Sequence, residues 1–239
     1  MHLKKLLSKM AFAMTNRQYY LYPKKPFTIL VEGNIGSGKS LFLNHFKRYP
    51  SMKVFDEPIH AWRDCGGHNL LDLMYKDPEK WGFSLQSYIQ LTMLEQHVKP
   101  IKEPIKFMER SIFSARHCFV EKLMKDGMLT QESAAVLDEW YKWIINNVDI
   151  PVDLVVYMRT SPEIVMQRIK ERNRQEEKNI TYDFIKDLHE IHDTWLCDTK
   201  TDTKKLPLVI LDGNVDKNNM EQEFRKYDSY IMDCISTLS

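Results

Sequence analysis

The sequence lacks the features that mark several large classes of protein. Its four cysteines are far apart and form no Cys-x-x-Cys pair, which argues against a zinc site or a disulfide framework and favours free thiols in a reducing compartment. No apolar stretch approaches the roughly 20 residues that span a bilayer. With 34 basic and 33 acidic side chains the net charge is +1, so nothing favours a nucleic acid polymer or a membrane as partner.

The chain also lacks a linker rich in Gly, Ser or Pro. At 239 residues, 43% of them hydrophobic, it can bury one sizeable core. We therefore expect a single domain over residues 26–239.

Acidic side chains are absent from the first 31 residues, which carry several lysines. Leucines and methionines fall on one helical face between those lysines, which is typical of a mitochondrial transit peptide. The stretch has only one Arg and one Ser, so a flexible basic tail over residues 1–25 is the alternative. Mitochondrial and cytoplasmic locations both stay open.

Residues 28–40 read Thr-Ile-Leu-Val-Glu-Gly-Asn-Ile-Gly-Ser-Gly-Lys-Ser, a full match to the phosphate-binding pattern G-x-x-x-x-G-K-[ST]. The glycines let successive backbone N–H groups face a polyphosphate, and the helix that follows offers its positive end. We expect Lys39 to reach the β- and γ-phosphates of ATP and the Ser40 hydroxyl to bind Mg²⁺. The residues assigned to nucleotide binding are Gly33, Asn34, Gly36, Ser37, Gly38, Lys39 and Ser40.

Two further strands are predicted to end on charged residues. Residues 53–55 lead to Glu57, a candidate general base, because parallel sheets bind ligands past the carboxyl ends of their strands. Residues 105–108 lead to Glu109, which can hold Mg²⁺, and to Arg110, which can stabilise a transferring phosphoryl group. A buried ion pair without catalytic duty is the alternative for Glu109 and Arg110.

Strands are also predicted at residues 27–31, 153–158 and 206–211, with helices at 84–97, 111–126, 131–146 and 182–196 between them. Five short strands that alternate with helices indicate an α/β fold, with a parallel sheet covered on both faces.

A run of basic residues ends the helix that Pro162 opens and that we expect to extend to Glu177. Arg168, Arg172 and Arg174 suit a lid that clamps phosphates, although a solvated charged face is the common alternative. Because the chain also carries a phosphate-binding loop, we favour a short Arg-rich lid.

Two other clusters favour no ligand. His189 and His192 are three residues apart rather than four, and no third ligand is in view, so we expect no zinc site. The aromatic residues Trp140, Tyr141 and Trp143 predict packing or a contact between the helices of a dimer.

Several motifs follow one another over residues 26–212. They lie at residues 32–40, 57–62, 73–78, 108–121, 139–142, 157–162 and 188–192. In these motifs the chain resembles the deoxynucleoside kinase family, within it the insect multisubstrate and mitochondrial thymidine kinase types. The resemblance implies a P-loop kinase fold and ATP-dependent 5′-phosphorylation of thymidine, deoxycytidine and, more weakly, purine deoxynucleosides, in nucleotide salvage.

The resemblance also implies roles for single residues. Glu57 would take the proton of the substrate 5′-hydroxyl, with Arg110 beside it, Lys39 on the phosphates and Glu109 on the Mg²⁺ side. Arg172 and Arg174 match lid arginines. The residues implied to bind the nucleoside are Glu57, Trp62, Met74, Tyr75, Gln86, Met93, Arg110, Ala115, Phe119 and Glu177.

Within that set, Trp62 and Phe119 would enclose the base, whose edge Gln86 would read. Tyr75 and Glu177 would hold the 3′-hydroxyl. Met93 and Ala115 replace the charged residues of purine- and cytidine-preferring relatives, which leaves room for the thymine methyl group.

The resemblance further implies a homodimer joined through residues 111–125 and 131–146, and inhibition by deoxythymidine triphosphate. Three rival hypotheses remain. A thymidylate-type kinase shares the loop, sheet and lid, but its anionic acceptor needs a cation at the far end of the pocket, whereas the carboxylate of Glu57 at the hydroxyl suits a neutral nucleoside. A GTP-binding switch matches only the loose Asp64-Cys-Gly-Gly67 pattern and lacks Asn-Lys-x-Asp. An inactive scaffold would not need Lys39, Ser40, Glu57 and Arg110.

Overall fold

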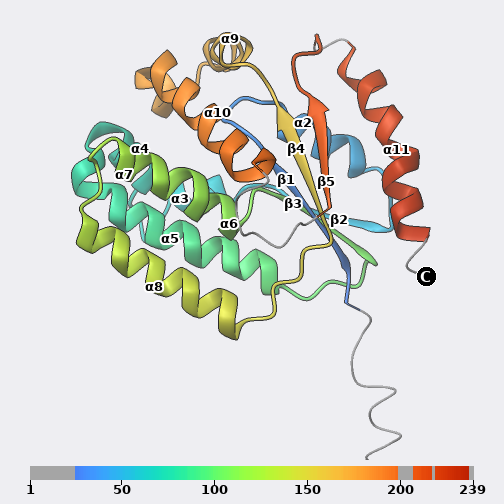
Figure 1. Ribbon diagram of the computed structural model, residues 1–239, viewed down its shortest axis with the longest axis horizontal. Coiled ribbons are helices and arrows are strands. Elements are labelled where there is room, and N and C mark those ends of the chain that lie inside the picture. The colour runs from blue at the N-terminus through green and yellow to red at the C-terminus, as the bar shows by residue number, and fades with distance from the viewer. Residues whose placement is uncertain (1–24, 199–206, 217–218, 237–239) are drawn as a thin grey trace, which may run out of the picture.

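A five-stranded sheet forms the centre of the computed structural model, which describes residues 25–198, 207–216 and 219–236 (Figure 1). All its neighbouring strands are parallel, and their order is β2-β3-β1-β4-β5. The strands are β1 (Phe27–Glu32), β2 (Met52–Phe55), β3 (Ile105–Glu109), β4 (Leu154–Arg159) and β5 (Leu208–Asp212). The α/β fold with a five-stranded parallel sheet is therefore confirmed.

The central strand β1 pairs with β3 on one side and β4 on the other. All but the first of its residues are buried, as expected for a parallel strand that is covered on both faces. The chain moves from β1 outward to β2 on one side, and from β3 it crosses to β4 on the other. A reversal of this kind opens a crevice at the carboxyl ends of the strands, where ligands bind in such sheets.

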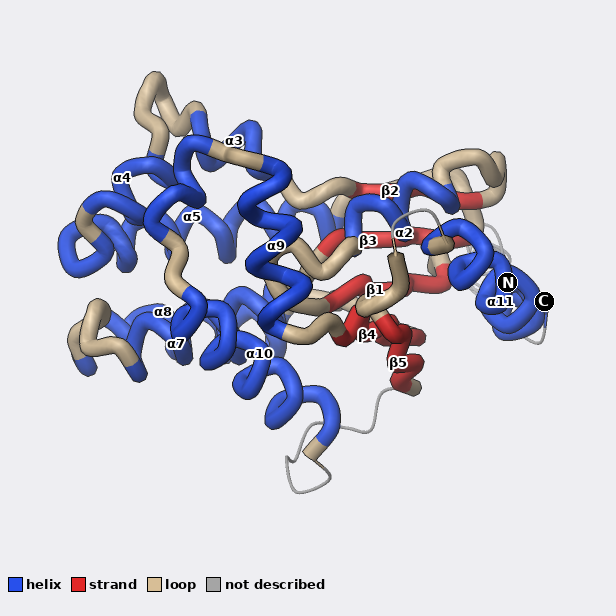
Figure 2. Tube along the Cα trace, turned by 90° about the horizontal axis from the view of Figure 1, so that it is seen from above, coloured by secondary structure: helices blue, strands red, loops and turns tan. Residues whose placement is uncertain are grey.

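Helices cover the two faces of the sheet differently. On one side lie α2 (Lys39–Phe46) and α11 (Met220–Ser236), while α4 (Leu70–Lys76), α5 (Pro78–Val98), α7 (Glu121–Lys125) and α8 (Gln131–Asn147) gather on the other (Figures 1 and 2). The remaining helices are α3 (Ile59–Arg63), α6 (Ile112–Ser114), α9 (Pro162–Arg172) and α10 (Tyr182–Cys197).

Aromatic side chains fill the core between the sheet and the α2/α11 pair. The Phe46 ring stacks on Phe107 of β3 with ring centroids 4.9 Å apart, and Phe42 meets Phe224 of α11 edge to face at 5.1 Å. This packing fixes α2, and with it the preceding loop, against the sheet.

Local sequence signals explain where the longest helix begins. The Asp77 side chain accepts a hydrogen bond from the Lys80 amide, and Pro78 occupies the first turn of α5. An Asp cap followed by Pro is a strong start signal, because Asp accepts a hydrogen bond from an otherwise unpaired amide of the first turn and Pro has no amide N–H to leave unpaired. The helix predicted at 84–97 therefore starts earlier, at Pro78.

One predicted helix differs in its internal geometry and another in its extent. The segment predicted at 111–126 is continuously helical from Ile112 to Lys125, but a π-helical turn, η1 (Ala115–Val120), separates α6 from α7. The helix after Pro162 ends at Arg172 rather than Glu177, because Asn173 adopts a left-handed conformation with φ 50°; a separate 3₁₀ turn, η2 (Gln175–Asn179), follows.

Some predictions are left without a structural outcome. The proposed tail or transit segment at 1–25 lies, apart from Lys25, outside the described residues, and so does the first residue of the strand predicted at 206–211. That residues 26–239 form one domain stays a prediction. Of the helices that the structure describes, none has the length and apolar character to span a bilayer.

Candidate active site

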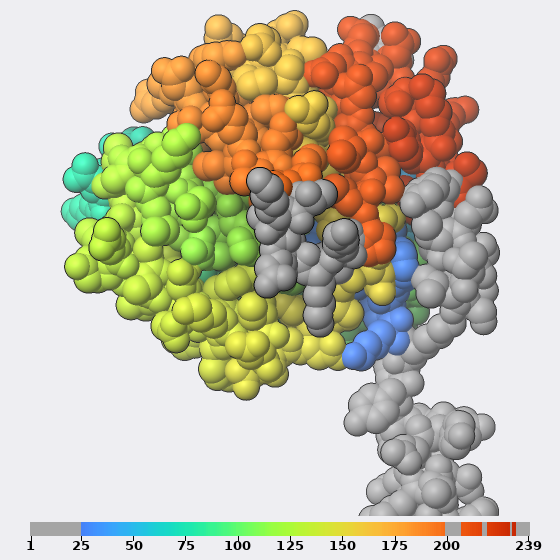
Figure 3. All heavy atoms as spheres, in the orientation of Figure 1, coloured from blue at the N-terminus to red at the C-terminus, as the bar shows by residue number. Residues whose placement is uncertain are grey.

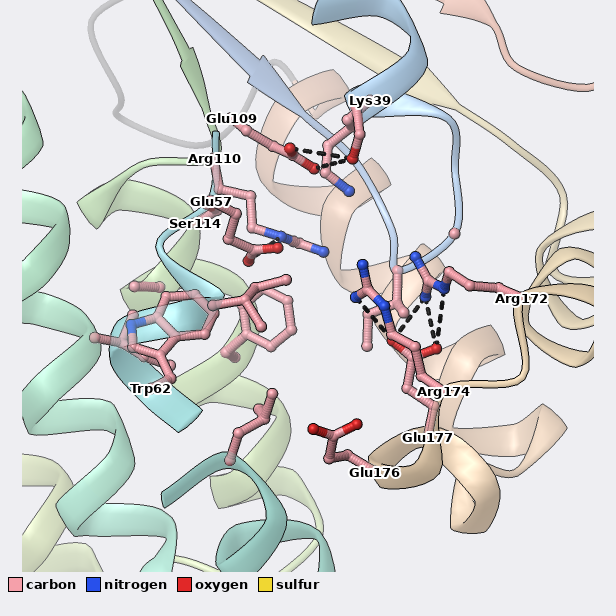
Figure 4. A pocket seen from close by; sticks show the side chains of 18 of the residues that line it. Lys39, Glu57, Trp62, Glu109, Arg110, Ser114, Arg172, Arg174, Glu176 and Glu177 are labelled. Atoms are coloured by element: carbon pink, nitrogen blue, oxygen red, sulfur yellow. Dashed lines mark hydrogen bonds and ion pairs between the residues drawn. The ribbon is translucent and has the colours of Figure 1, made fainter. Parts of the chain in front are cut away.

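A cavity of about 510 Å³ lies past the carboxyl ends of β1, β2 and β3. Its walls come from the phosphate-binding loop, helices α3 to α5, the end of β3 and the segment after α9 (Figure 4). The predicted site residues that line it are Gly36, Gly38, Lys39, Ser40, Glu57, Trp62, Met74, Tyr75, Gln86, Met93, Glu109, Arg110, Ala115, Phe119, Arg172, Arg174 and Glu177. Residues assigned from distant parts of the sequence thus meet in one place.

Glycine is required at the start of the phosphate-binding loop. Gly33 has φ +143°, and a Cβ atom there would lie 2.6 Å from the carbonyl oxygen of Met158 on β4. A side chain is excluded both by this contact and by the backbone conformation. The tight passage brings the loop directly over the sheet edge.

Lys39 is folded back onto its own loop. Its Nζ donates hydrogen bonds to the carbonyl oxygens of Gly33, at 3.1 Å, and Asn34, at 2.7 Å. The side chain is buried, and burial, together with the charge of Arg110, lowers the pKa of Lys39 to about 7. A polyphosphate in the loop would favour the charged ammonium.

Three of the residues assigned to the nucleotide, Gly33, Asn34 and Ser37, do not line the cavity. The Asn34 amide donates to the carbonyl oxygen of Ile185 on α10 at 2.8 Å, so this side chain fastens the loop to the protein. The Ser37 carbonyl oxygen accepts from Thr160 Oγ1 at 2.9 Å and from Arg168 at 3.2 Å. Arg168, predicted to share in the lid, thus anchors the loop.

A hydroxyl and a carboxylate meet at the start of α2. Ser40 Oγ donates to the two carboxylate oxygens of Glu109 at 2.9 and 3.1 Å (Figure 4). These are oxygen donors of the kind that bind Mg²⁺ through one or two protein ligands plus phosphates and water. The pair therefore fits the predicted metal site.

An ion pair lies where the acceptor is predicted to bind. Glu57 Oε1 is 2.8 Å from Nε of Arg110, and the Arg110 guanidinium carbon lies 4.6 Å from the centre of the Phe119 ring. Burial raises the pKa of Glu57, an effect that the charge of Arg110 opposes. Nη1 of Arg110 is buried without a protein partner, so it remains available to a ligand.

Uncharged side chains form the far end of the cavity. Trp62 is held by a hydrogen bond from its indole nitrogen to Thr92 Oγ1 at 2.9 Å. Gln86 is buried, and its side-chain oxygen has no partner in the protein. Met93 and Ala115 are almost fully buried beside it. A flat, uncharged group with a hydrogen-bonding edge suits this end.

The segment after α9 faces these groups across the cavity. Arg172 and Arg174 both converge on the Glu177 carboxylate, at 2.7 and 3.3 Å (Figure 4). Tyr75 lines the cavity as well, and its pKa is raised by burial and then by the charge of Glu177. Arg172 and Arg174 therefore line the cavity with their charges paired to Glu177, and their role as lid arginines stays a prediction.

One contact of this segment escaped the sequence analysis. Glu176 accepts two hydrogen bonds from Arg63 of α3, at 2.6 and 3.1 Å. The two residues are 113 positions apart, and nothing in a single sequence pairs them. The contact joins the lid to the wall that carries Trp62.

Comparison with known proteins shows which family the chain belongs to. A family model described as deoxynucleoside kinase matches residues 29–237. The chain belongs to the deoxynucleoside kinase family. The human protein named mitochondrial thymidine kinase 2 is 41% identical over 203 residues, covering 85% of this chain and 77% of that protein.

More distant members show the same relationship. Chicken deoxycytidine kinase 2 is 30% identical, with 85% of this chain and 89% of that protein covered. A probable deoxycytidine kinase of fowlpox virus is 32% identical, with 88% of each chain covered. The chain is accordingly a kinase that phosphorylates deoxynucleosides with ATP, and the hypotheses of a GTP-binding switch and of an inactive scaffold are wrong.

The altered pKa of Lys39 leads to a testable prediction. At pH 8 the Lys39 amine of the ligand-free protein is mostly neutral, and it becomes charged when phosphates bind beside it. Binding of Mg·ADP should therefore take up about one proton. At pH 5.5 the amine is already charged and should contribute almost none. Calorimetry in buffers of different ionisation enthalpy measures this uptake.

The matched control is Lys39→Arg, which is charged in both states. It should bind Mg·ADP without the extra proton at pH 8. Equal proton uptake by both proteins would assign the proton to another group.

Proposed function

We propose that the enzyme transfers the γ-phosphoryl group of ATP to the 5′-hydroxyl of pyrimidine deoxynucleosides, thymidine and deoxycytidine, and accepts purine deoxynucleosides less well. The observation that carries this proposal is a carboxylate, Glu57, at the junction between the phosphate-binding loop and an uncharged pocket. A monophosphate acceptor would bring two negative charges beside that carboxylate, whereas a nucleoside brings none. The similarity to thymidine and deoxycytidine kinases supports the two pyrimidines.

In this mechanism, Glu57 accepts the proton of the 5′-hydroxyl while the oxygen attacks the γ-phosphorus and ADP leaves. Arg110 orients the Glu57 carboxylate and, through its free Nη1, stabilises charge on the transferring group. Lys39 would stabilise negative charge on the β- and γ-phosphates, on the ATP side of the transferring group. Most of the rate acceleration is expected from this positioning and charge stabilisation.

The metal belongs to the same proposal. Ser40 and Glu109 are the residues that would hold Mg²⁺. When bound, the ion neutralises phosphate charge. When the lid binds ATP, Arg172 and Arg174 would release the Glu177 carboxylate and pair with the phosphates instead.

At the nucleoside end, the base would lie between Trp62 and Phe119, with Gln86 on its edge. The unpartnered oxygen of Gln86 supports this role, because a buried polar atom is stabilised by a hydrogen-bonding ligand. Tyr75 and Glu177 would bind the 3′-hydroxyl. Met93, Met74 and Ala115 limit the space around the base.

A homodimer is part of the proposal. Helix α8 lies at the surface of the molecule (Figure 3), and its Val136, Trp140 and Trp143 are 46%, 59% and 55% exposed. Leu91 on the neighbouring α5 is 51% exposed. Exposed aromatic and aliphatic side chains at helical spacing favour an interface.

We expect Trp140→Glu combined with Trp143→Glu to convert the dimer to a monomer, because the two charges cannot be buried unpaired. Sedimentation measures the mass. The control is Lys142→Ser, a change at an exposed polar residue of the same helix, which should stay dimeric. A wild-type monomer would refute the proposal.

The deciding experiment is steady-state phosphorylation of thymidine, deoxycytidine, deoxyadenosine, deoxyguanosine and thymidine monophosphate by Mg·ATP. We expect turnover of the nucleosides, pyrimidines first, and none of the monophosphate. Turnover of the monophosphate alone would make the acceptor wrong. Added deoxythymidine triphosphate tests the proposed end-product inhibition, and localisation with and without residues 1–25 separates the mitochondrial from the cytoplasmic proposal.

The base is tested by Glu57→Gln, which keeps the shape of the side chain and loses its basicity. We expect kcat to fall by about 10²–10³-fold while thymidine still binds. Steady-state kinetics and calorimetry measure the two quantities. Glu121→Gln, at a carboxylate exposed on α7, is the control, and wild-type turnover by Glu57→Gln would remove Glu57 as the base.

A further inference from the structure

A buried carboxyl group at the end of β1 has no role in the mechanism above. Glu32 is fully buried, directly before Gly33 of the phosphate-binding loop. One of its oxygens accepts a hydrogen bond from the Ser111 hydroxyl at 2.5 Å, and the other has no partner in the protein. Burying a carboxyl group costs free energy unless the group is hydrogen-bonded or paired with a charge, so a buried carboxyl group with one unpartnered oxygen requires an explanation.

The partner, Ser111, organises the turn after β3. Its Oγ accepts hydrogen bonds from the backbone amides of Phe113 and Ser114, both at 3.2 Å, while its own proton goes to Glu32. The Ser111 amide in turn donates to Ser114 Oγ at 3.2 Å. Ser111 therefore caps α6 and is itself held by Glu32.

The residue just before Ser111 is Arg110, and its backbone is strained. Arg110 has φ +62°, a left-handed conformation that costs free energy for a residue other than glycine. Such a conformation persists only where its surroundings fix it. Two contacts flank it: its own amide donates to the Val31 carbonyl oxygen at 3.0 Å, and Ser111 is bound to Glu32.

The consequence of this backbone conformation is the direction of the Arg110 side chain. It lies over Phe119 and reaches Glu57 in the cavity. Because β1 and β3 are adjacent and Val31 is in register with Glu109, the carboxyl group of Glu32 meets the chain immediately after Arg110. Glu32, the last residue of β1, is thus placed to hold this turn through Ser111.

We propose that Glu32 is a positioning residue for Arg110 and acts through Ser111. The link from Glu32 to Ser111 holds the strained turn, and the turn directs the guanidinium toward the acceptor hydroxyl and Glu57. This inference rests on the proposed role of Arg110 in phosphoryl transfer.

A second role for Glu32 is electrostatic, since Arg110 and Lys39 lie close enough to stabilise its charge. Burial, however, is the dominant influence and raises the pKa of Glu32 to about 7. Both protonation states keep an oxygen that can accept the Ser111 proton, whereas only the ionised form supplies a counter-charge. The two roles make different predictions for Glu32→Gln, which keeps an acceptor oxygen but cannot carry a charge.

The first test compares Glu32→Ala, Ser111→Ala and Glu32→Gln in thymidine phosphorylation. Since a displacement of about 1 Å can cost about 100-fold in rate, we expect each alanine variant to lower kcat/KM for thymidine about 10- to 100-fold. Glu32→Gln retains an acceptor oxygen for the Ser111 hydroxyl and should stay within about threefold of wild type. A loss in Glu32→Gln as large as in Glu32→Ala would overturn the proposal in favour of the charge.

Double variants establish the route of the effect. Glu32→Ala with Ser111→Ala should be no worse than the more damaging single variant, because both break the same link. In an Arg110→Ala background, Glu32→Ala should weaken thymidine binding no further, as measured by calorimetry. Additive losses in either cycle would overturn the proposal.

Controls separate positioning from folding and from the proposed function itself. Thr130→Ala removes a capping hydroxyl at the remote helix α8 and should leave kcat/KM unchanged. Thermal unfolding checks that each variant is folded, and Glu32→Gln provides a folded reference. If Arg110→Ala keeps wild-type activity, the proposed function of Arg110 fails; if it loses activity but Glu32→Ala does not, only the present inference fails.

Discussion

The site depends on placing five ionisable side chains in a small buried volume. Glu32 and Glu109 are the last residues of β1 and β3, and Glu57 follows β2 by two residues, so the three carboxyl groups lie near Lys39 and Arg110. Each charge is costly to bury alone, and each is stabilised by an opposite neighbour. Burial raises the pKa values of Glu32 and Glu57 and lowers that of Lys39, so burial favours the neutral form of each group. Phosphates would shift Lys39 toward its charged form.

Sequence patterns located the parts of the site that depend on neighbours along the chain. The loop that ends in Lys39 and Ser40 follows a fixed spacing, and Glu57 and Arg110 come directly after apolar strands. The carboxyl ends of parallel strands lie along one edge of the sheet. Acidic residues that are far apart in the sequence could therefore be expected to meet at that edge. The function followed from these residues and from the resemblance that they carry.

Other features depend on contacts that spacing cannot encode. Asn34 belongs to the loop pattern, yet its side chain binds Ile185 of α10. Arg63 finds Glu176 only after the chain has folded. The end of the helix before Asn173 could not be predicted, because the surrounding sequence is rich in helix-forming residues. Asn can adopt the left-handed backbone conformation, and the composition of the segment does not show that it does so here. Tertiary contacts therefore decided the ends of helices and the roles of polar side chains.

The two halves of the cavity differ in how firmly they are held. The loop is fixed by buried contacts from Thr160 and from the α2/α11 core, in which Asp228 also bonds His45 of α2. The lid is held by ion pairs of Arg63 with Glu176 and of Arg172 and Arg174 with Glu177, in which the carboxylates are largely buried and the arginines partly exposed. In the proposed mechanism Glu177 is shared between two subsites, because it pairs with the arginines that would bind phosphate and lines the cavity with Tyr75, where the sugar would bind. Phosphates that took Arg172 and Arg174 from Glu177 would leave its carboxylate to the 3′-hydroxyl, and this exchange would couple the two subsites.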